Sequence, residues 1–329
     1  MSGDDAEQST ENTRKQVMGT ELNSVPFLLS APQVIGLGQC SLDILGQTDV
    51  YPELDQKAEL DDLLVQGGGP VATALVTLAR LGVAVAMVGA VGDDDYGRQI
   101  RAGLCDEQVD CSHLREISGE SSQVAFIVVD AAGHRNIFWH RGSAFPQWSK
   151  QAEALLATDC ARILHLDGLH LDAAIPAAQA ARQRGVVTVL DAGTFRPGIE
   201  ELLPLIDHLV VSERFAYAAT GAATLEAALP RLRDYAGAEV TVTMGRAGSV
   251  SLDGTGQVLK TPAFAVEAVD TTGCGDVFHG SYIYGLLQGW ALPRILPFAS
   301  ACAALKTRAL GGRTAIPGLD EVEGLLREG

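Results

Sequence analysis

The second half of the chain alternates short apolar runs with longer mixed stretches, and this alternation constrains the fold more than any other feature. The apolar runs RILHLDG, VVTVLD, HLVVS and VTVTMG follow one another from residue 162 onward, and each interval between them is long enough for a helix. Strands that alternate with helices of about 10–15 residues build a parallel sheet that is covered on both faces. The sequence therefore predicts an α/β sandwich.

The first half of the chain carries the same kinds of element. PQVIGLGQC is a short apolar run that ends in glycines, which indicates a buried strand. GGGPVATALVTLARLG, residues 67–82, predicts a glycine turn that opens a helix, since Pro70 suits a first helical turn and Gly82 suits a C-terminal stop. VAVAMVGAVG, residues 83–92, predicts the next buried strand. Both halves therefore belong to one α/β sandwich.

Two segments depart from this alternation. Within residues 122–142, two β-rich runs, Val124–Val129 and Asn136–His140, flank the turn DAAGHR, which favours a hairpin. The stretch at about 43–66 is mixed and polar and contains the turn YPELDQ. We expect these two segments to form a small β-rich lid on the sandwich.

The chain opens with the polar, acidic stretch MSGDDAEQSTENTRKQ, which is unlike a signal peptide. We expect residues 1–25 to form a mobile tail and residues 26–329 to form a single domain that includes the lid. No apolar run reaches the ~18 residues that a membrane span needs. The 6 cysteines form no CxxC pair, which favours reduced thiols in a cytoplasmic protein.

The net charge of −17 argues against nucleic acid or an anionic membrane as the main partner, because such binding needs cations that neutralise phosphates. Small anionic substrates remain possible, since a few local cations can reverse the electrostatic field in one cleft.

Two common nucleotide-binding motifs are absent from the sequence. GLGQCS, residues 36–41, lacks the third glycine of a dinucleotide fingerprint, and the chain has no Gly-Lys dipeptide for a Walker A loop.

The stretch VDTTGCGDVFHG, residues 269–280, offers a different way to handle phosphate. Gly273, Cys274 and Gly275 precede a predicted helix, so their backbone N–H groups can hold the charge that develops on a transferring phosphoryl group. Asp276, at the first turn of that helix, can accept a proton from an attacking hydroxyl. The alternative is an aspartate that only caps a helix after a glycine turn.

The same stretch resembles the D-T-x-G-A-G-D signature of the ribokinase-like (PfkB) carbohydrate kinase family, with Cys274 in place of the usual alanine. GGGPVATALVTLARLG resembles the family's G-G-x-x-A-N helix, and VGAVGDDDYG the strand and turn after it. VTMGRAGS resembles its T-x-G-x-x-G nucleotide loop, and AALKTRALGGRTAIP its C-terminal loop. These motifs cover roughly residues 33–320 in the family's order.

The resemblance implies a three-layer α/β/α sandwich with a mainly parallel sheet and a small β-rich lid. It also implies transfer of the γ-phosphate of ATP, with Mg²⁺, to a sugar hydroxyl. Asp276 matches the base, and the N–H groups of the three residues before it match the anion hole. Thr243, Gly245 and Gly248 match the loop around the ATP phosphates and ribose. Asp43, Gly68 and Gly69 match the sugar-binding residues, where a carboxylate can accept from two vicinal hydroxyls.

The resemblance further implies a monovalent-cation site, of the kind that holds K⁺ in many members, at Asp270, Thr272 and the loop 311–313. Two places depart from the family's pattern. Thr73 stands where asparagine is usual, so we expect a hydrogen bond to the substrate to be altered or lost. In VVSERFAYAATG the chain has Ser212 and Phe215 where the family's N-x-x-E acts on the Mg²⁺–phosphate network, and only Glu213 survives nearby.

These departures most resemble the sulfofructose kinase branch of the family, which phosphorylates a sugar that carries a sulfonate. A sulfonate needs local cations, and the lid segments contain four candidates: Lys57, Arg135, His140 and Arg141. For each of them, a solvated charge on the lid is the competing interpretation. The sequence favours a kinase for a ketose or a sulfofructose-like sugar.

Other functions stay open on the same fold. A nucleoside or vitamin kinase would need an aromatic surface, for which Phe138, Trp139 and Phe145 are candidates, although a lid core is the commoner use of such side chains. A catalytically silent sugar-binding protein would fit the missing N-x-x-E. The lid could also pair two copies of the chain, because exposed strand edges seek partners.

Overall fold

The structure of the chain is a computed structural model that describes residues 31–130, 133–236 and 239–328. The mobile tail predicted at residues 1–25 lies outside these ranges, so it stays a prediction. The strands are β1 Val34–Leu37, β2 Ser41–Thr48, β3 Asp62–Gly68, β4 Val85–Gly92, β5 Leu114–Ile117, β6 Val124–Asp130, β7 Arg135–His140, β8 Ile163–Leu166, β9 Val187–Ala192, β10 His208–Ser212, β11 Glu239–Thr243, β12 Ser249–Leu252 and β13 Val258–Thr261.

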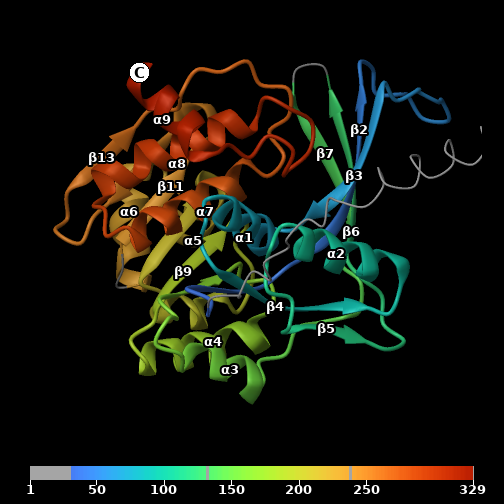
Figure 1. Ribbon diagram of the computed structural model, residues 1–329. Coiled ribbons are helices and arrows are strands. Elements are labelled where there is room, and N and C mark those ends of the chain that lie inside the picture. Colours follow the sequence, from blue (N-terminus) through green and yellow to red (C-terminus); the bar gives the residue numbers. More distant parts are fainter. Residues whose placement is uncertain (1–30, 131–132, 237–238, 329) are drawn as a thin grey trace, which may run out of the picture. The chain divides into compact units, whose positions relative to one another are not determined.

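The α-helices alternate with these strands (Figure 1). They are α1 Pro70–Arg80, α2 Asp95–Asp106, α3 Lys150–Leu156, α4 Leu171–Gln183, α5 Glu213–Thr220, α6 Leu225–Ala236, α7 Cys274–Leu287, α8 Leu292–Lys306 and α9 Leu319–Glu328. Pro70 is the first residue of α1, where its missing N–H group costs no helical hydrogen bond.

One large sheet forms the middle layer, in the order β13-β12-β11-β10-β9-β8-β1-β4-β5. Its strands are parallel except at the end of the sheet, where β12 pairs antiparallel with both β11 and β13. Two apolar cores cover its faces. In β1, Ile35 and Leu37 belong to the core with α3, α4, α5 and α6, whereas Val34 belongs to the core with α1, α2, α7, α8 and α9. The predicted three-layer α/β/α class with a mainly parallel sheet is confirmed.

A second sheet, in the order β3-β2-β6-β7, is built from the two segments that depart from the α/β alternation (Figure 1). We call it the small sheet. The hairpin predicted within residues 122–142 is present as the antiparallel pair β6 and β7. One face of the small sheet buries Leu45, Ile127 and Val129 against Leu310. The sheet is therefore packed on the C-terminal loop of the sandwich.

Helices α1 and α7 lie against each other on one face of the large sheet, and this contact places the site. A Cβ atom on Gly280 would lie 2.7 Å from the carbonyl oxygen of Ala74 and 2.8 Å from the Cβ atom of Thr77. Only glycine therefore allows α7 to approach α1 so closely. Phe278 and Tyr282 of α7 are buried in one apolar cluster with Val210 of β10.

Candidate active site

The turn before α7 has a backbone that requires glycine. Gly273 is the residue before the helix and has φ +75°, in the left-handed region. A Cβ atom there would lie 2.8 Å from both the Cα atom and the carbonyl oxygen of Gly312. The turn therefore lies directly against the C-terminal loop. A side chain at residue 273 would strain the backbone at this φ and would collide with Gly312, so it would displace the turn.

The N–H groups of this turn are not all available in the way the sequence suggested. The N–H group of Cys274 donates to the carbonyl oxygen of Thr271 at 3.3 Å, inside the turn itself. Gly275 is exposed, and its N–H group lies in the first turn of α7, where a helix offers no internal acceptor. An anion placed here would therefore meet the N–H groups of the two glycines, supported by the helix dipole.

Asp276 sits in the first turn of α7 and faces several positive charges. Burial raises the pKa of its carboxyl group, and the charges of His279, Arg135, Arg313 and Lys306 act in the opposite direction. A buried carboxylate whose pKa is raised, with cations within electrostatic reach, is a candidate for a group that accepts a proton.

Asp43 lies in β2, with 7% of its surface exposed, and holds the other end of the site. Its Oδ1 atom accepts a hydrogen bond from the Ser41 hydroxyl at 2.8 Å. Burial raises the pKa of Asp43 to about 6, the Ser41 bond and Arg313 lower it, and the charge of Asp276 raises it further. The two predicted carboxylates are therefore close enough to influence each other.

Arg313 links these two acids, and the sequence had indicated this residue only as part of a cation loop. Its guanidinium is buried, with 5% of the residue exposed, and donates from Nη2 to the carbonyl oxygen of Gly68 at 3.0 Å. Its charge lowers the pKa of Asp43 and of Asp276 alike. Burial lowers the pKa of Arg313 itself to about 10, so it stays positive at neutral pH.

The same guanidinium accounts for the unusual threonine in α1. The Nε atom of Arg313 donates to the Thr73 hydroxyl at 3.3 Å, and Thr73 is buried. The residue that departs from the family's pattern therefore contacts a protein cation.

Gly69, directly before α1, has φ +94°, and a Cβ atom there would lie 2.6 Å from the carbonyl oxygen of Gln39. This close approach explains why glycine is needed at that position.

The residues predicted to bind ATP lie together at the carboxyl edge of the large sheet. Ser212 ends β10, Thr243 ends β11, and the two are register partners in neighbouring parallel strands. The Ser212 hydroxyl donates to the carbonyl oxygen of Gly193 at 2.8 Å and accepts from the N–H group of Phe215 at 3.1 Å, so it caps α5. The Thr243 hydroxyl donates to the carbonyl oxygen of Val211 at 3.3 Å.

The glycine loop after β11 completes this edge. Gly245 and Gly248 have φ +55° and +89°. A Cβ atom on Gly248 would lie 2.0 Å from the carbonyl oxygen of Thr261 in β13. Ligands of open α/β sheets bind outside the carboxyl ends of the strands, and this loop leaves backbone rather than side chains at that place.

A buried polar network under the turn escaped the sequence analysis. The Nδ1 atom of His279 lies 2.7 Å from the carbonyl oxygen of Gly275 and 3.2 Å from a carboxylate oxygen of Asp191, and its Nε2 atom lies 3.0 Å from the carbonyl oxygen of Val210. Both ring nitrogens of His279 therefore lie at hydrogen-bond distance from oxygen atoms that can only accept or are carboxylate oxygens. Burial raises the pKa of Asp191 to about 7, and the charge of His279 lowers it.

Asp167 is a second acid that the sequence analysis missed. It follows β8 directly, is buried, and accepts from the N–H groups of Gln39 at 2.6 Å and Leu169 at 3.0 Å. Burial raises its pKa to about 6, and the charge of Asp276 contributes in the same direction. The sequence could have indicated this acid through its position directly after a predicted strand, because the carboxyl ends of parallel strands lie at one edge of the sheet.

The four lid cations have different surroundings. Arg135 donates from Nη1 to the Thr271 hydroxyl at 2.6 Å, which brings it against the turn before α7. Arg141 lies over the Trp139 ring at 5.6 Å and faces Arg196 and His170, whose pKa values its charge lowers. Lys57 and His140 are exposed. The structure thus brings one of the four candidates into contact with the turn.

The aromatic candidates for a nucleoside platform are all exposed. Phe138 and Trp139 lie on β7 with 67% and 44% of their surfaces exposed, and Phe145 is 46% exposed beside His170. They therefore do not form a buried lid core, which is the commoner use of such side chains. Pairing at the sheet edge leaves the whole of β7 exposed, since it has a neighbour on one side only.

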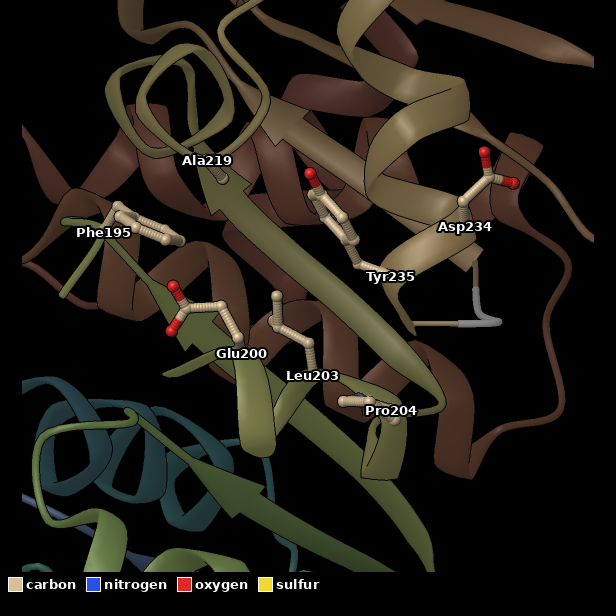
Figure 2. Close-up of a pocket in the computed structure, with 7 residues that line it drawn as sticks. All are labelled: Phe195, Glu200, Leu203, Pro204, Ala219, Asp234 and Tyr235. Carbon is tan, nitrogen blue, oxygen red and sulfur yellow. The ribbon is translucent and has the colours of Figure 1, made fainter. Parts of the chain in front are cut away.

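A separate hollow of about 310 Å³ lies beside α5 and α6 (Figure 2). Figure 2 shows Phe195 and Glu200 on one side of it and Asp234 on the other. It contains none of the predicted site residues, and its two carboxylates disfavour phosphate. The residues that line it are Phe195, Glu200, Leu203, Pro204, Ala219, Asp234 and Tyr235.

An α/β sandwich with a glycine turn and an acid at the start of α7, and with a second acid on the small sheet, fits a small-molecule kinase. The chain also matches the model of the pfkB family of carbohydrate kinases over residues 33–318, and it belongs to that family. The resemblance inferred from its motifs is confirmed. The protein is an ATP-dependent kinase of the sugar and nucleoside kinase type.

Known proteins support this assignment. The chain is 31% identical to a fructokinase of Klebsiella pneumoniae, over 79% of this chain and 92% of that protein. It is 30% identical to an ATP-dependent ribose-1-phosphate kinase of Halopiger xanaduensis, over 90% and 98%. The solved structure of Arabidopsis thaliana ribokinase with ribose and ATP superposes with a TM-score of 0.78 at 24% identity, covering 91% and 99%, which shows the shared fold. None of the described helices is both long and apolar enough to cross a membrane.

Proposed function

We propose that this kinase phosphorylates a hydroxyl group of a ketose or a sulfofructose-like sugar. The observation that carries the proposal is that Asp43 and Asp276 both lie within the electrostatic reach of Arg313, whose guanidinium donates to the carbonyl oxygen of Gly68 beside Asp43. An acid that accepts from vicinal hydroxyls and an acid that accepts a proton are the two groups that sugar phosphorylation requires. The charge of Arg313 favours the ionised form of both acids and so opposes the effect of their burial.

The reaction is positioned by residues of this chain. Asp43 accepts hydrogen bonds from two neighbouring hydroxyls of the sugar, while the missing side chain of Gly68 leaves room for the Asp43 carboxylate. Asp276 takes the proton of the attacking hydroxyl. The N–H groups of Gly273 and Gly275 hold the charge that develops on the transferring phosphoryl group. ATP lies along the edge of Thr243 and the loop 245–248, and closure of the small sheet over the site excludes water.

Mg²⁺, when bound with ATP, neutralises the charge of the phosphates. The residues present fit a metal that is held mainly by phosphates and water, because Mg²⁺ keeps several waters and needs few protein ligands. The described residues contain no group of three His, Cys, Asp or Glu side chains that could hold a metal alone. Glu213 heads α5, where its carboxylate accepts from the Tyr217 hydroxyl at 3.2 Å, and it would act on Mg²⁺ through a water molecule.

A cationic patch supports an acceptor that carries a negative group. Burial lowers the pKa of Arg196, and the neighbouring charge of Arg141 lowers it further, so the two guanidiniums repel each other. An anionic substituent on the sugar, a sulfonate or a phosphate, would relieve this repulsion. The relative that acts on ribose 1-phosphate takes an acceptor of that charge.

The alternatives have weaker support. A nucleoside acceptor would stack on Phe138 or Trp139, but these rings lie on the open strand β7. A silent sugar-binding protein would not need Asp276 at the start of α7. The six free cysteines support the cytoplasmic location that belongs to this proposal.

An acceptor panel read by ADP release tests the proposal. Fructose, ribose, 2-keto-3-deoxygluconate, fructose 6-phosphate, sulfofructose and adenosine are compared side by side with ATP and Mg²⁺. We expect a ketose or sulfofructose to give the highest kcat/KM. Phosphorylation of adenosine without any sugar would overturn the acceptor class, and tight sugar binding without ADP release would favour a silent binder.

The outer face of the small sheet supports a homodimer. Val65, Ile44, Phe126 and Phe138 are register partners across β3, β2, β6 and β7, and they form one row. Phe126 and Phe138 have 51% and 67% of their surfaces exposed. A contiguous apolar row of this kind marks an interaction surface. We expect Phe126→Ser to convert a dimer to a monomer in light scattering, whereas Val258→Ser, at an exposed valine of β13, leaves the mass unchanged.

A further inference from the structure

A lysine side chain is buried behind the catalytic turn. Lys306 is the last residue of α8 and has 0% of its surface exposed. Its Nζ atom donates a hydrogen bond to the carbonyl oxygen of Asp270 at 2.9 Å. Lysine is almost never fully buried unless its charge is paired, so this position calls for an explanation.

The Asp270 residue that it contacts ties the turn to the C-terminal loop. Its Oδ1 atom accepts from the N–H group of Thr272 at 2.8 Å and from the Thr272 hydroxyl at 2.7 Å. Its Oδ2 atom accepts from the N–H group of Gly311 at 2.7 Å. Its own N–H group donates to the carbonyl oxygen of Thr307 at 3.1 Å. The start of the catalytic turn is therefore fixed by bonds on every side of Asp270.

These contacts do not fit the monovalent-cation site that the family resemblance implied. That site would use Asp270, Thr272 and the loop 311–313. The carboxylate oxygens of Asp270 already accept from protein donors, and its carbonyl oxygen accepts from the ammonium of Lys306. A metal cation at this carbonyl would also lie next to the fixed charge of Lys306, and like charges at that range repel strongly in a buried place.

We propose that the ammonium of Lys306 takes the place of a monovalent cation in this protein, so that the catalytic turn holds its shape without K⁺. The inference rests on the proposed kinase function. Lys306 is a positioning residue, because it touches the turn and not the reacting atoms.

The chemistry of the side chain suits this role. A lysine ammonium is a compact positive charge with three donors, and it can satisfy a carbonyl oxygen as a small cation does. It is carried on the end of α8, whose apolar face is buried against α7, so its position does not depend on the salt in solution. The charge also reaches the base, since Lys306 lowers the pKa of Asp276.

The first test compares kcat of the wild-type protein in KCl and NaCl at one ionic strength, with the acceptor that the panel identifies. We expect equal values. Lys306→Ala should lose about 10²-fold in kcat in NaCl, because a displaced catalytic turn costs about that much. KCl or NH₄Cl should restore much of this loss, since the truncated side chain leaves room for a cation. Lys306→Met removes the charge but fills the space, so it should stay inactive in either salt.

A second readout does not depend on turnover. The melting temperature of Lys306→Ala should rise in KCl relative to NaCl, while that of the wild-type protein should not change. Lys260→Ala, at an exposed lysine paired with Glu226, is the matched control and should respond to neither salt. Several-fold activation of the wild-type protein by K⁺ would overturn the inference, even if the variants failed to fold. If no acceptor is phosphorylated, the proposed function fails while the melting experiment still decides the role of Lys306.

Discussion

The carboxylate of Asp43 lies against the backbone of Gly68 so closely that a Cβ atom at residue 68 would come within 2.0 Å of Oδ2. Asp43 lies in β2 and Gly68 ends the neighbouring strand β3, where its register partner is Ser41. The missing side chain of Gly68 therefore leaves the space in which the Asp43 carboxylate, proposed to bind the sugar, lies. Arg313 fixes the same backbone from the other side, through the carbonyl oxygen of Gly68.

The first prediction follows from this contact. Gly68→Ala should displace the Asp43 carboxylate and lower kcat/KM for the acceptor by about 10²-fold, because a misplacement of about 1 Å at a positioning group has that effect. The KM for ATP should change little, since ATP binds at the edge formed by β10 and β11. Gly103→Ala in α2, where an added Cβ atom has no neighbour within 4 Å, is the control. An unchanged KM for the acceptor in Gly68→Ala would remove Asp43 from the sugar site.

The second prediction concerns pH. Burial raises the pKa of Asp43 to about 6, so the carboxylate gains a proton as the pH falls from 7 to 5. A protonated Asp43 loses acceptor capacity, and the KM for the acceptor should rise in that range. Asp43→Asn should bind the acceptor weakly at every pH and should lack this rise. A flat acceptor KM between pH 7 and pH 5 in the wild-type protein would contradict the assignment.

The free energy of unfolding should rise as the pH falls, over the same range in which binding of the acceptor weakens. The folded pKa of Asp43 exceeds the unfolded value of about 3.9, so the folded state binds more protons between these two values. The free energy of unfolding that this group contributes therefore rises as the pH falls through about 6. Asp43→Asn has no carboxyl group that titrates at this position. The difference in free energy of unfolding, variant minus wild-type protein, should therefore fall from pH 7 to pH 5 when both are measured by urea unfolding.

The alternation of strands and helices made the layers of the fold predictable. Apolar runs such as HLVVS and VTVTMG are buried on both faces only in a covered parallel sheet, and they became β10 and β11. The turn at Gly273–Gly275 was predictable for a similar reason, since glycines before a helix allow the positive φ that Gly273 adopts there. These signals are local, and local signals survive in the sequence.

The partners of the site were not predictable because they are set by tertiary contacts. Arg313 lies 240 residues from Thr73 in the chain, and no spacing rule connects them. Lys306 was read as part of a loop motif, since burial of its ammonium is visible only once α8 packs on α7. His279 and Asp191 meet through a helix and a strand that are not neighbours in sequence. Asp43, Asp276 and the glycines of the turn could be predicted, whereas the buried acids Asp167 and Asp191 and the role of Arg313 could not.

The third prediction tests the base. Asp276→Asn should lower kcat by about 10²-fold or more, because an amide cannot take the proton of the attacking hydroxyl. Binding of ATP should persist, since the contacts proposed for ATP come from Thr243 and the loop 245–248. ADP release gives the rate, and calorimetric titration of ATP gives the affinity. Equal turnover in the variant and the wild-type protein would exclude Asp276 as the base.

The last prediction separates the folding role of the catalytic turn from its chemical role. An added Cβ atom at Gly275 has no neighbour within 4 Å, and φ at this residue is not in the left-handed region, in contrast to Gly273. Gly275→Ala should therefore stabilise the protein by up to about 1 kcal/mol, because alanine loses less backbone entropy in a helix. The new methyl group would crowd the phosphoryl group held by the N–H groups, so kcat should fall.

The matched change is Gly273→Ala, which should lose both stability and activity, since its backbone angle and its contact with Gly312 require glycine. Urea unfolding and ADP release on the two variants measure the two quantities separately. If Gly275→Ala keeps full turnover, then the phosphoryl group does not lie over Gly275. A more stable protein that turns over slowly is the result that places the transferring group at the start of α7.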